Sequence, residues 1–149
     1  MKKLLFKTDG ALGPLFLRVS LGTVVFAHGA QKLLGWFGGY GFSGTMDFFT
    51  NMMQLPWLVA FLLILLESVG ALALFLGIAT RLVATAYVFL ALGIMFTVHT
   101  PYGFFMNWFG NQAGEGIENI LLWTGMATAL VLLGSGRYSV DSYLYGSSS

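Results

Sequence analysis

Four stretches of the chain are apolar over roughly the 20 residues that a helix needs to cross a lipid bilayer. They are residues 12–36, 55–76, 81–100 and 116–133. Their apolar runs are continuous, whereas membrane β-strands alternate apolar and polar positions. Since every backbone polar group in lipid needs an internal partner, continuous runs favour helices. The sequence therefore predicts an all-α, integral-membrane four-helix bundle, formed by residues 1–149 as a single domain.

Composition agrees with the bilayer as the main solvent. Only 9% of the residues are charged and 57% are hydrophobic, whereas soluble domains are about 25% charged. The net charge is +1 and the basic residues are scattered, so we expect no nucleic-acid partner. Cysteine is absent, and any redox chemistry must therefore use groups other than thiols, disulfides or iron–sulfur clusters.

Four crossings would place most of the basic residues on one side of the membrane. These residues are Lys2, Lys3, Lys7, Arg81 and Arg137. The positive-inside rule assigns that side to the cytoplasm. We therefore expect both termini in the cytoplasm, in a multi-pass protein of the cell (inner) membrane.

The two segments on the opposite side are crowded with aromatic residues and glycine. They are residues 37–54 and 102–115. The first of them is predicted to contain a short amphipathic helix at the membrane interface. Together the two segments form either an aromatic belt that anchors the bundle in the bilayer or a lid over a cavity.

Polar residues inside the predicted spans are functional candidates, because an ionisable group in lipid is costly unless it is paired or solvated. The candidates within the spans and at their outer ends are Arg18, His28, Gln31, Lys32, Glu67, His99, Glu115, Glu118 and Asn119. The outer ends of three spans should bring five of these side chains to the same membrane face. That set is His28, Lys32, His99, Glu115 and Glu118, and it predicts a polar pocket there.

Two ion pairs follow from spacing and depth. Glu115 and Glu118 share a helix face and would repel each other, so Lys32 is predicted to neutralise them. Glu67 lies near the middle of its span, and Arg18 is its predicted counter-ion, because a long side chain can cover the difference in depth. A pair between Arg18 and Glu67 would either fix the register of the helices or form a proton or headgroup site.

The two histidines leave several interpretations open. His28 and His99 could be hydrogen-bonded structural residues, or they could perform acid–base chemistry beside Glu115 and Glu118. Two histidines on separate helices also fit a haem, although nothing else in the sequence supports one. Histidine and glutamate together suit several divalent metals without specifying any of them, so no metal is assigned.

Several motifs resemble the DoxX family of small four-helix membrane proteins over nearly the whole chain. The most specific is AHGAQKLLGWFGGYG at residues 27–41, which joins polar groups to a glycine-aromatic turn. Further motifs are ESVGALALFLGIATR at 67–81, His99 before a Gly-Phe loop, GEGIENILL at 114–122 and GSGRYSVD at 134–141. The resemblance implies a bundle in the cytoplasmic membrane that acts as an oxidoreductase or as a subunit of one. The polar residues of this chain that match the family's motifs are His28, Gln31, Lys32, Glu67, His99, Glu115 and Glu118.

The favoured hypothesis is a membrane redox protein whose pocket holds a quinone headgroup. The residues predicted to be catalytic are His28, Lys32, His99, Glu115 and Glu118; those predicted to contact the cofactor are Arg18, Gln31, Trp36, Glu67 and Asn119. No electron carrier is visible in the sequence, so a soluble or membrane redox partner would have to exchange the electrons.

Two other functions stay open. The chain could be a non-enzymatic membrane subunit that docks or stabilises a partner enzyme. It could also be a small transporter or a lipid-headgroup binder, because buried charges mark permeation paths as well. Four helices are few for a transporter, and a homo-oligomer would supply more.

Overall fold

A computed structural model describes residues 8–9, 11–145 and 147–148 of the chain. It is helical apart from one pair of two-residue strands, β1 (Thr8–Asp9) and β2 (Ser147–Ser148), which run parallel. The predicted all-α class is therefore confirmed. Lys2, Lys3 and Lys7, on which the predicted orientation partly depends, lie outside the described residues.

Each of the four predicted spans contains a long helical segment. The first is α2 (Gly13–Leu34), and the second consists of α4 (Trp57–Leu65), η3 (Leu66–Gly70) and α5 (Ala71–Leu76). The third consists of α6 (Thr80–Ile94), η4 (Met95–His99) and η5 (Thr100–Tyr102), and the fourth is α7 (Glu118–Leu133). Prolines begin two of these segments: Pro14 lies in the first turn of α2, and Pro56 precedes α4.

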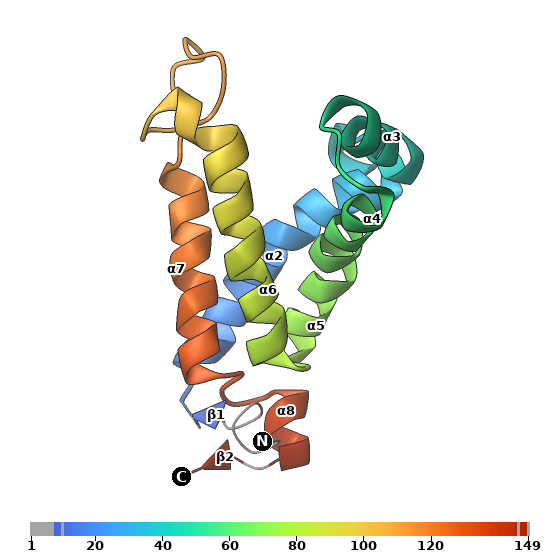
Figure 1. The fold of residues 1–149 in the computed structure, drawn as a ribbon. Helices are drawn as coiled ribbons and strands as arrows, with labels where there is room; N and C mark the ends of the chain where they lie inside the picture. Colours follow the sequence, from blue (N-terminus) through green and yellow to red (C-terminus); the bar gives the residue numbers. More distant parts are fainter. Residues whose placement is uncertain (1–7, 10, 146, 149) are drawn as a thin grey trace.

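Short elements connect the long helices at two opposite ends of the molecule. Between α2 and α4 lie η1 (Trp36–Gly38), α3 (Gly41–Asp47) and η2 (Phe48–Met52). These elements and the loop 103–117, which joins η5 to α7, lie at one end, here called the cavity end (Figure 1). The other end, here called the α8 end, contains α8 (Val140–Tyr145) and the two short strands (Figure 1).

Helix α2 holds the molecule together. It contacts α4, η3 and α5 on one side and α7 on the other, while α6 packs along α7 and also contacts α5. Toward the cavity end, the arm formed by α6 and α7 diverges from the arm formed by α3 and α4 (Figure 1). The core side chains between the helices include Leu21, Val25, Leu74, Tyr87, Trp123 and Leu130.

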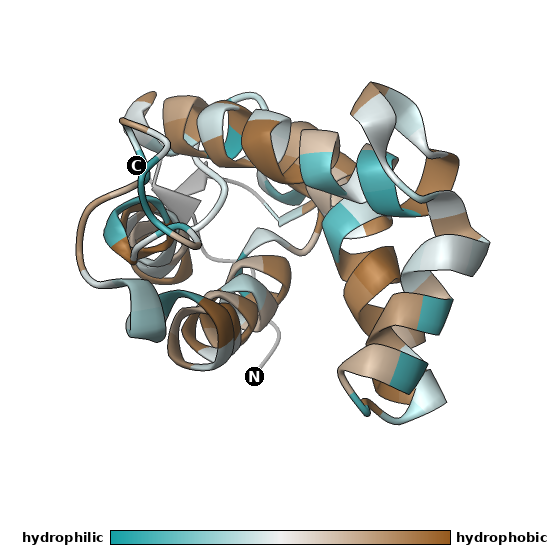
Figure 2. Cartoon of the chain, turned by 90° about the horizontal axis from the view of Figure 1, so that it is seen from above, coloured by the Kyte–Doolittle hydropathy of each residue, from teal (hydrophilic) through white to brown (hydrophobic). Residues whose placement is uncertain are grey.

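Many large apolar side chains are exposed on the helices, whose ribbons are mostly hydrophobic in Figure 2. Phe16, Leu82, Phe89, Phe96 and Leu132 are each 68–71% exposed. Monomeric soluble proteins rarely expose such extensive apolar surface, whereas lipid tails solvate it readily. Among the described residues, two helices are long and apolar enough to cross a membrane, namely Trp57–Leu76 and Thr80–Tyr102.

The remaining two long helices differ from these in length or charge. Helix α7 has 16 residues, and α2 has 22 residues but carries both Arg18 and Lys32. By length and composition, the two middle helices are thus able to cross a membrane. Crossing by all four, and the side on which the termini lie, stay predictions.

Within the described part of the chain, wide π-helical turns interrupt the regular geometry at η2, η3 and η4. Such turns are rare and occur frequently at functional sites. Glu67 lies in η3, and His99 is the last residue of η4. A wide turn releases backbone carbonyls from the helical pattern, and the Tyr87 hydroxyl donates a hydrogen bond to the released Leu66 carbonyl oxygen at 2.8 Å.

Candidate functional site

A cavity of about 380 Å³, here called the main cavity, lies at the cavity end among α2, η3, α6, η4, the loop 103–117 and α7. Its polar lining consists of His28, Lys32, Glu67, His99, Glu115 and Asn119. Its apolar lining consists of Ile94, Met106, Ile120 and Trp123. Four of the five residues predicted to be catalytic therefore border one space. Their catalytic roles stay predictions.

The strongest polar interaction at this cavity joins Lys32 to Glu67. The Nζ atom of Lys32 lies 2.5 Å from Oε2 of Glu67. The Glu67 side chain is 3% exposed and that of Lys32 is 24% exposed, so the pair is largely removed from solvent. Both ion-pair predictions are therefore wrong, because Lys32 does not neutralise Glu115 and Glu118, and Glu67 does not pair with Arg18.

A close approach of two backbones explains why Lys32 reaches Glu67. Gly29 lies against η3 so tightly that a Cβ atom on it would overlap the Glu67 backbone carbonyl. Lys32 follows Gly29 by three positions and therefore lies on the same face of α2. Glycine at position 29 and the wide turn at η3 together bring the ammonium and carboxylate groups into contact.

His28 lies one turn before Lys32 and faces α7. Its ring meets the edge of the Trp123 ring with the centroids 5.4 Å apart and the planes inclined by 61°. The imidazole also forms a hydrogen bond with the Gln31 side chain. Since His28 borders the main cavity, a ligand there could use its remaining nitrogen as donor or acceptor.

Among the described residues, His99 has a hydrogen-bond partner for one ring nitrogen, which leaves the other for a ligand. Its Nδ1 lies 2.7 Å from the backbone oxygen of Glu115. Because a carbonyl oxygen can only accept, Nδ1 is the donor in this hydrogen bond. In the neutral ring Nε2 is then an acceptor, so His99 can receive a proton from a ligand.

Glu115 and Glu118 hold the loop 103–117 in place. Oε2 of Glu115 accepts a hydrogen bond from the Asn107 backbone N–H at 2.7 Å. Oε2 of Glu118 accepts from the Met106 backbone N–H at 3.1 Å and from Nε1 of Trp108 at 3.2 Å. The two carboxylates thus accept hydrogen bonds from uncharged N–H groups of the loop and form no ion pair with Lys32. Glu118 does not line the main cavity, whereas Met106, which it holds, does.

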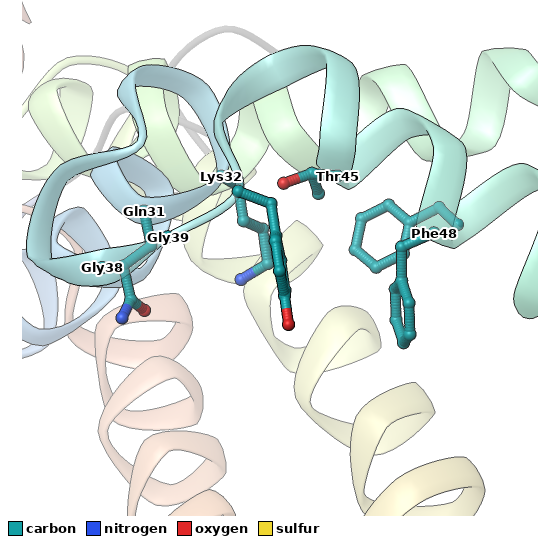
Figure 3. A pocket seen from close by; sticks show the side chains of 8 residues that line it. Gln31, Lys32, Gly38, Gly39, Thr45 and Phe48 are labelled. Carbon is teal, nitrogen blue, oxygen red and sulfur yellow. The ribbon is translucent and has the colours of Figure 1, made fainter.

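The remaining candidates near the cavity end lie in different surroundings. Asn119 borders the main cavity. Gln31 instead borders a second cavity of about 260 Å³, which it shares with Lys32 and Thr45 (Figure 3). Trp36 is 53% exposed and lines neither of these two cavities.

Arg18 lies toward the α8 end and is fully buried. Its Nη1 donates to the carbonyl oxygens of Leu74 at 3.1 Å and Phe75 at 2.9 Å. Its Nη2 donates to the carbonyl oxygens of Arg137 at 3.2 Å and Tyr138 at 3.1 Å. The guanidinium thus satisfies the end of α5 and the segment after α7, where orphan carbonyls require donors. Arg18 lines neither of the two cavities at the other end, and its predicted contact with a cofactor stays a prediction.

Asp141 is a buried residue with a structural role that the sequence analysis missed. Its Oδ1 accepts from the Ala79 N–H at 2.8 Å and its Oδ2 accepts from the Thr80 N–H at 2.9 Å. A carboxylate here caps the beginning of α6 from a distant part of the chain. Asp141 is the last residue of the GSGRYSVD motif, and its place in that motif could have marked it as a candidate.

A metal centre has no support in the described residues, where no group of three or more histidine, aspartate or glutamate side chains is arranged to hold an ion. The site is instead an enclosed mixture of hydrogen-bond donors, proton acceptors and apolar walls. Such a site suits a small planar ligand with polar edges.

Comparison with known proteins relates the chain to one family. Residues 13–100 match the sequence model of the DoxX family. The chain is also 30% identical over 134 residues to the "Putative oxidoreductase CatD" of Bacillus subtilis (strain 168), and the match covers 90% of this chain and 88% of that protein. No solved structure gives a significant match. The family match includes His28, Lys32, Glu67 and His99 of the main cavity.

Proposed function

The chain belongs to the DoxX family, and from that premise we propose that it acts as a membrane oxidoreductase, or as the quinone-reactive subunit of one. The main cavity is the proposed site for the quinone headgroup. The relative in Bacillus subtilis is named as an oxidoreductase, which supports the general class of activity. The quinone is proposed from the chemistry of the cavity.

The observation that carries the proposal is that the lining of the main cavity combines polar and apolar side chains. A quinone headgroup is a flat apolar ring with a carbonyl acceptor at each of two opposite edges. Ile94, Ile120 and Trp123 can pack against such a ring, while His28 and Lys32 can donate to a carbonyl oxygen. A volume of about 380 Å³ falls within the range of roughly 300–1,000 Å³ that small-molecule sites occupy.

Reduction of a quinone to a hydroquinone consumes two electrons and two protons. In this proposal the electrons come from a soluble or membrane redox partner, since the side chains at the cavity carry none, and both protons come ultimately from solvent. Lys32 and His28 are the proposed hydrogen-bond donors to the quinone oxygens. Nε2 of His99 is the proposed acceptor for a hydroquinone proton in the reverse direction.

The loop 103–117 is the proposed cover of the site. Glu115 and Glu118 hold its backbone, and Met106 from this loop contributes to the cavity wall. In this arrangement Glu118 acts as a positioning residue that does not touch the headgroup. The exposed rings of Trp108 and Phe109, at 71% and 89%, would lie at the membrane interface.

We further propose that all four long helices cross the inner membrane, with both termini in the cytoplasm. Support comes from the exposed apolar side chains on all four segments and from Arg81 and Arg137 near the α8 end. Partial burial of Lys32 against Glu67 and full burial of Arg18 remove much of the charge that would oppose insertion of α2.

The test is direct binding of short-chain ubiquinone and menaquinone analogues to the purified protein in neutral detergent. Trp123 lines the cavity, so its fluorescence should change as the headgroup enters. His28→Ala should weaken binding about tenfold, since it removes one donor beside a buried carbonyl. Tyr143→Phe, at a side chain that is 89% exposed at the α8 end, is the matched control. Absence of binding, or equal affinity of all three proteins, would refute the proposed site.

A further inference from the structure

A second cavity lies on the other side of Lys32 and has different chemistry. This side cavity, of about 260 Å³, is formed by the end of α2, η1, α3 and η2 (Figure 3). Its walls include Gln31, Lys32, Gly39, Thr45, Phe48 and Phe49. Lys32 lines both cavities, and its ammonium group contacts Glu67, which lines the main cavity.

The side cavity is rich in donors and lacks acidic side chains in its lining. Among the described residues that border it, Lys32 alone is charged at neutral pH. Gln31 adds an amide, whose Nε2 has one long contact of 3.4 Å with the Phe37 carbonyl oxygen. In the main cavity, by contrast, Glu67 and Glu115 accompany the same ammonium group. The side cavity therefore favours an anion.

Thr45 adds a second polar group to the side cavity, independently of Lys32. Its side chain is only 5% exposed and lines the cavity, and its hydroxyl forms no hydrogen bond to any residue that the structure describes. The hydroxyl is therefore available to a ligand in the cavity. The neighbouring Thr50 shows the usual arrangement, because its hydroxyl donates to the Met46 carbonyl oxygen at 2.8 Å. The Thr45 hydroxyl instead lies near Lys32 at the cavity (Figure 3).

The opposite wall of the side cavity is apolar. Phe48 is 40% exposed, and Phe49 packs against a small buried cluster of Met46, Ala60 and Ile64. A ligand whose charged oxygens meet Lys32 and Thr45 can therefore extend an apolar chain past Phe48 and Phe49 out of the molecule.

We propose that the side cavity binds the anionic head of an amphiphile, such as a lipid phosphate or carboxylate, through Lys32, Thr45 and Gln31. The anion competes with Glu67 for the Lys32 ammonium group, since Nζ already contacts Oε2 of Glu67 at 2.5 Å. Occupancy of the side cavity therefore loosens the ion pair and presents a freer Glu67 carboxylate to the main cavity. This site does not depend on the proposed quinone chemistry.

The test uses the full chain in a neutral maltoside detergent, without any quinone, and dodecyl phosphate as the probe. Titration calorimetry should show saturable binding of dodecyl phosphate. Thr45→Val should weaken it roughly tenfold, because one hydrogen bond to a charged group is lost. Thr50→Val is the matched control, since it makes the same substitution on η2 outside the cavity lining, and it should leave the affinity unchanged.

The role of the Lys32 ammonium group in binding is tested with a double variant, so that no buried charge is left unpaired. The double variant Lys32→Gln with Glu67→Gln should abolish dodecyl phosphate binding, while its thermal unfolding checks that it folds. Infrared difference spectra should show a shift of a carboxylate band on binding, and Glu67→Gln should remove that band. Equal affinity of the Thr45→Val, Thr50→Val and unchanged proteins would overturn the site.

Two further probes distinguish the source of the anion. Inorganic phosphate should bind at least tenfold more weakly than dodecyl phosphate, and equal affinities would overturn the amphiphile in favour of a free anion. In vesicles, phosphatidylglycerol should compete with dodecyl phosphate, whereas phosphatidylcholine alone should not. Failure of quinone analogues to bind would leave these expectations unchanged, so the two proposals can fail separately.

Discussion

The two ends of the molecule both bury charged side chains, but they satisfy them differently. At the α8 end, Arg18 and Asp141 bond to backbone groups at the end of α5 and the start of α6. At the cavity end, Lys32 and Glu67 bond to each other and border open space. Buried charge alone therefore does not identify a functional site in this fold. Backbone partners indicate a structural role, whereas side-chain partners beside a cavity leave groups free for a ligand.

Among the substitutions that compare the two ends, we expect that of Arg18 to cause the largest loss of stability. Arg18→Met removes the donor to four carbonyl oxygens and should lower the free energy of unfolding by about 3–5 kcal/mol. Thermal and denaturant unfolding in detergent measures this loss. Arg18→Lys should not restore stability, because a single ammonium group cannot replace the planar fork of guanidinium donors.

An exposed arginine at the same end provides the control for Arg18. Arg137→Gln should change stability little, because its side chain is exposed and contacts the Tyr138 ring at 5.7 Å. If Arg18→Met kept normal stability but lost ligand binding, the assignment of a structural role to the α8 end would be contradicted.

At the cavity end, removal of one partner of the Lys32–Glu67 ion pair should lower the stability of the protein. Removal of both partners should restore most of it. Lys32→Met leaves the Glu67 carboxylate, at 3% exposure, without its cation. We expect a loss of roughly 2–3 kcal/mol in the free energy of unfolding. Adding Glu67→Gln should restore most of it, because the double variant has no unpaired charge.

This recovery distinguishes the Lys32–Glu67 ion pair from Arg18, whose partners are backbone carbonyl oxygens and cannot be removed by a second substitution. A double-mutant cycle should give a coupling energy of about 1–3 kcal/mol between Lys32 and Glu67. Additive losses would show that the two side chains do not interact in the folded protein. Ligand binding should stay lost in the double variant even where stability returns, because the function needs the groups themselves.

Sequence reasoning predicted the helices well because the apolar length of a span directly constrains its structure. It also brought His28, Lys32, His99 and Glu115 to the same end, since counting helix turns gives depth along a span. It failed on the partner of Lys32, because depth does not give the rotation of one helix against another. That rotation depends here on the contact at Gly29 and on the wide turn at η3. It failed on Arg18, because that side chain lies level with the end of α5 and bonds to Leu74 and Phe75.

Asp141 could not be predicted by the same reasoning, since it follows the last span and caps a helix that begins about 60 residues earlier. The loop contacts of Glu115 and Glu118 were missed for a related reason. Their partners are backbone N–H groups in an irregular segment, and a search for charged partners overlooks them.

Asp141→Ala should therefore have a smaller effect than Arg18→Met. It removes the acceptor for the Ala79 and Thr80 N–H groups and should cost about 1–2 kcal/mol of stability. Asp141→Asn, which keeps one acceptor oxygen, should recover part of it. Hydrogen exchange should locate the change at the start of α6, and uniform exchange changes along α6 and α7 would contradict a local cap.

Glu118→Gln should have the smallest effect on stability and the most local one. It weakens the acceptor for the Met106 N–H and the Trp108 indole, both on the loop 103–117, and should lower the free energy of unfolding by less than about 1 kcal/mol. Hydrogen exchange of Met106 should nevertheless become faster, while exchange in α2 and α5 stays unchanged. The same substitution at Glu115 should release Asn107 instead. If Glu118→Gln instead destabilised the whole bundle, Glu118 would resemble Arg18, and the loop would be part of the core and not a cover over the cavity.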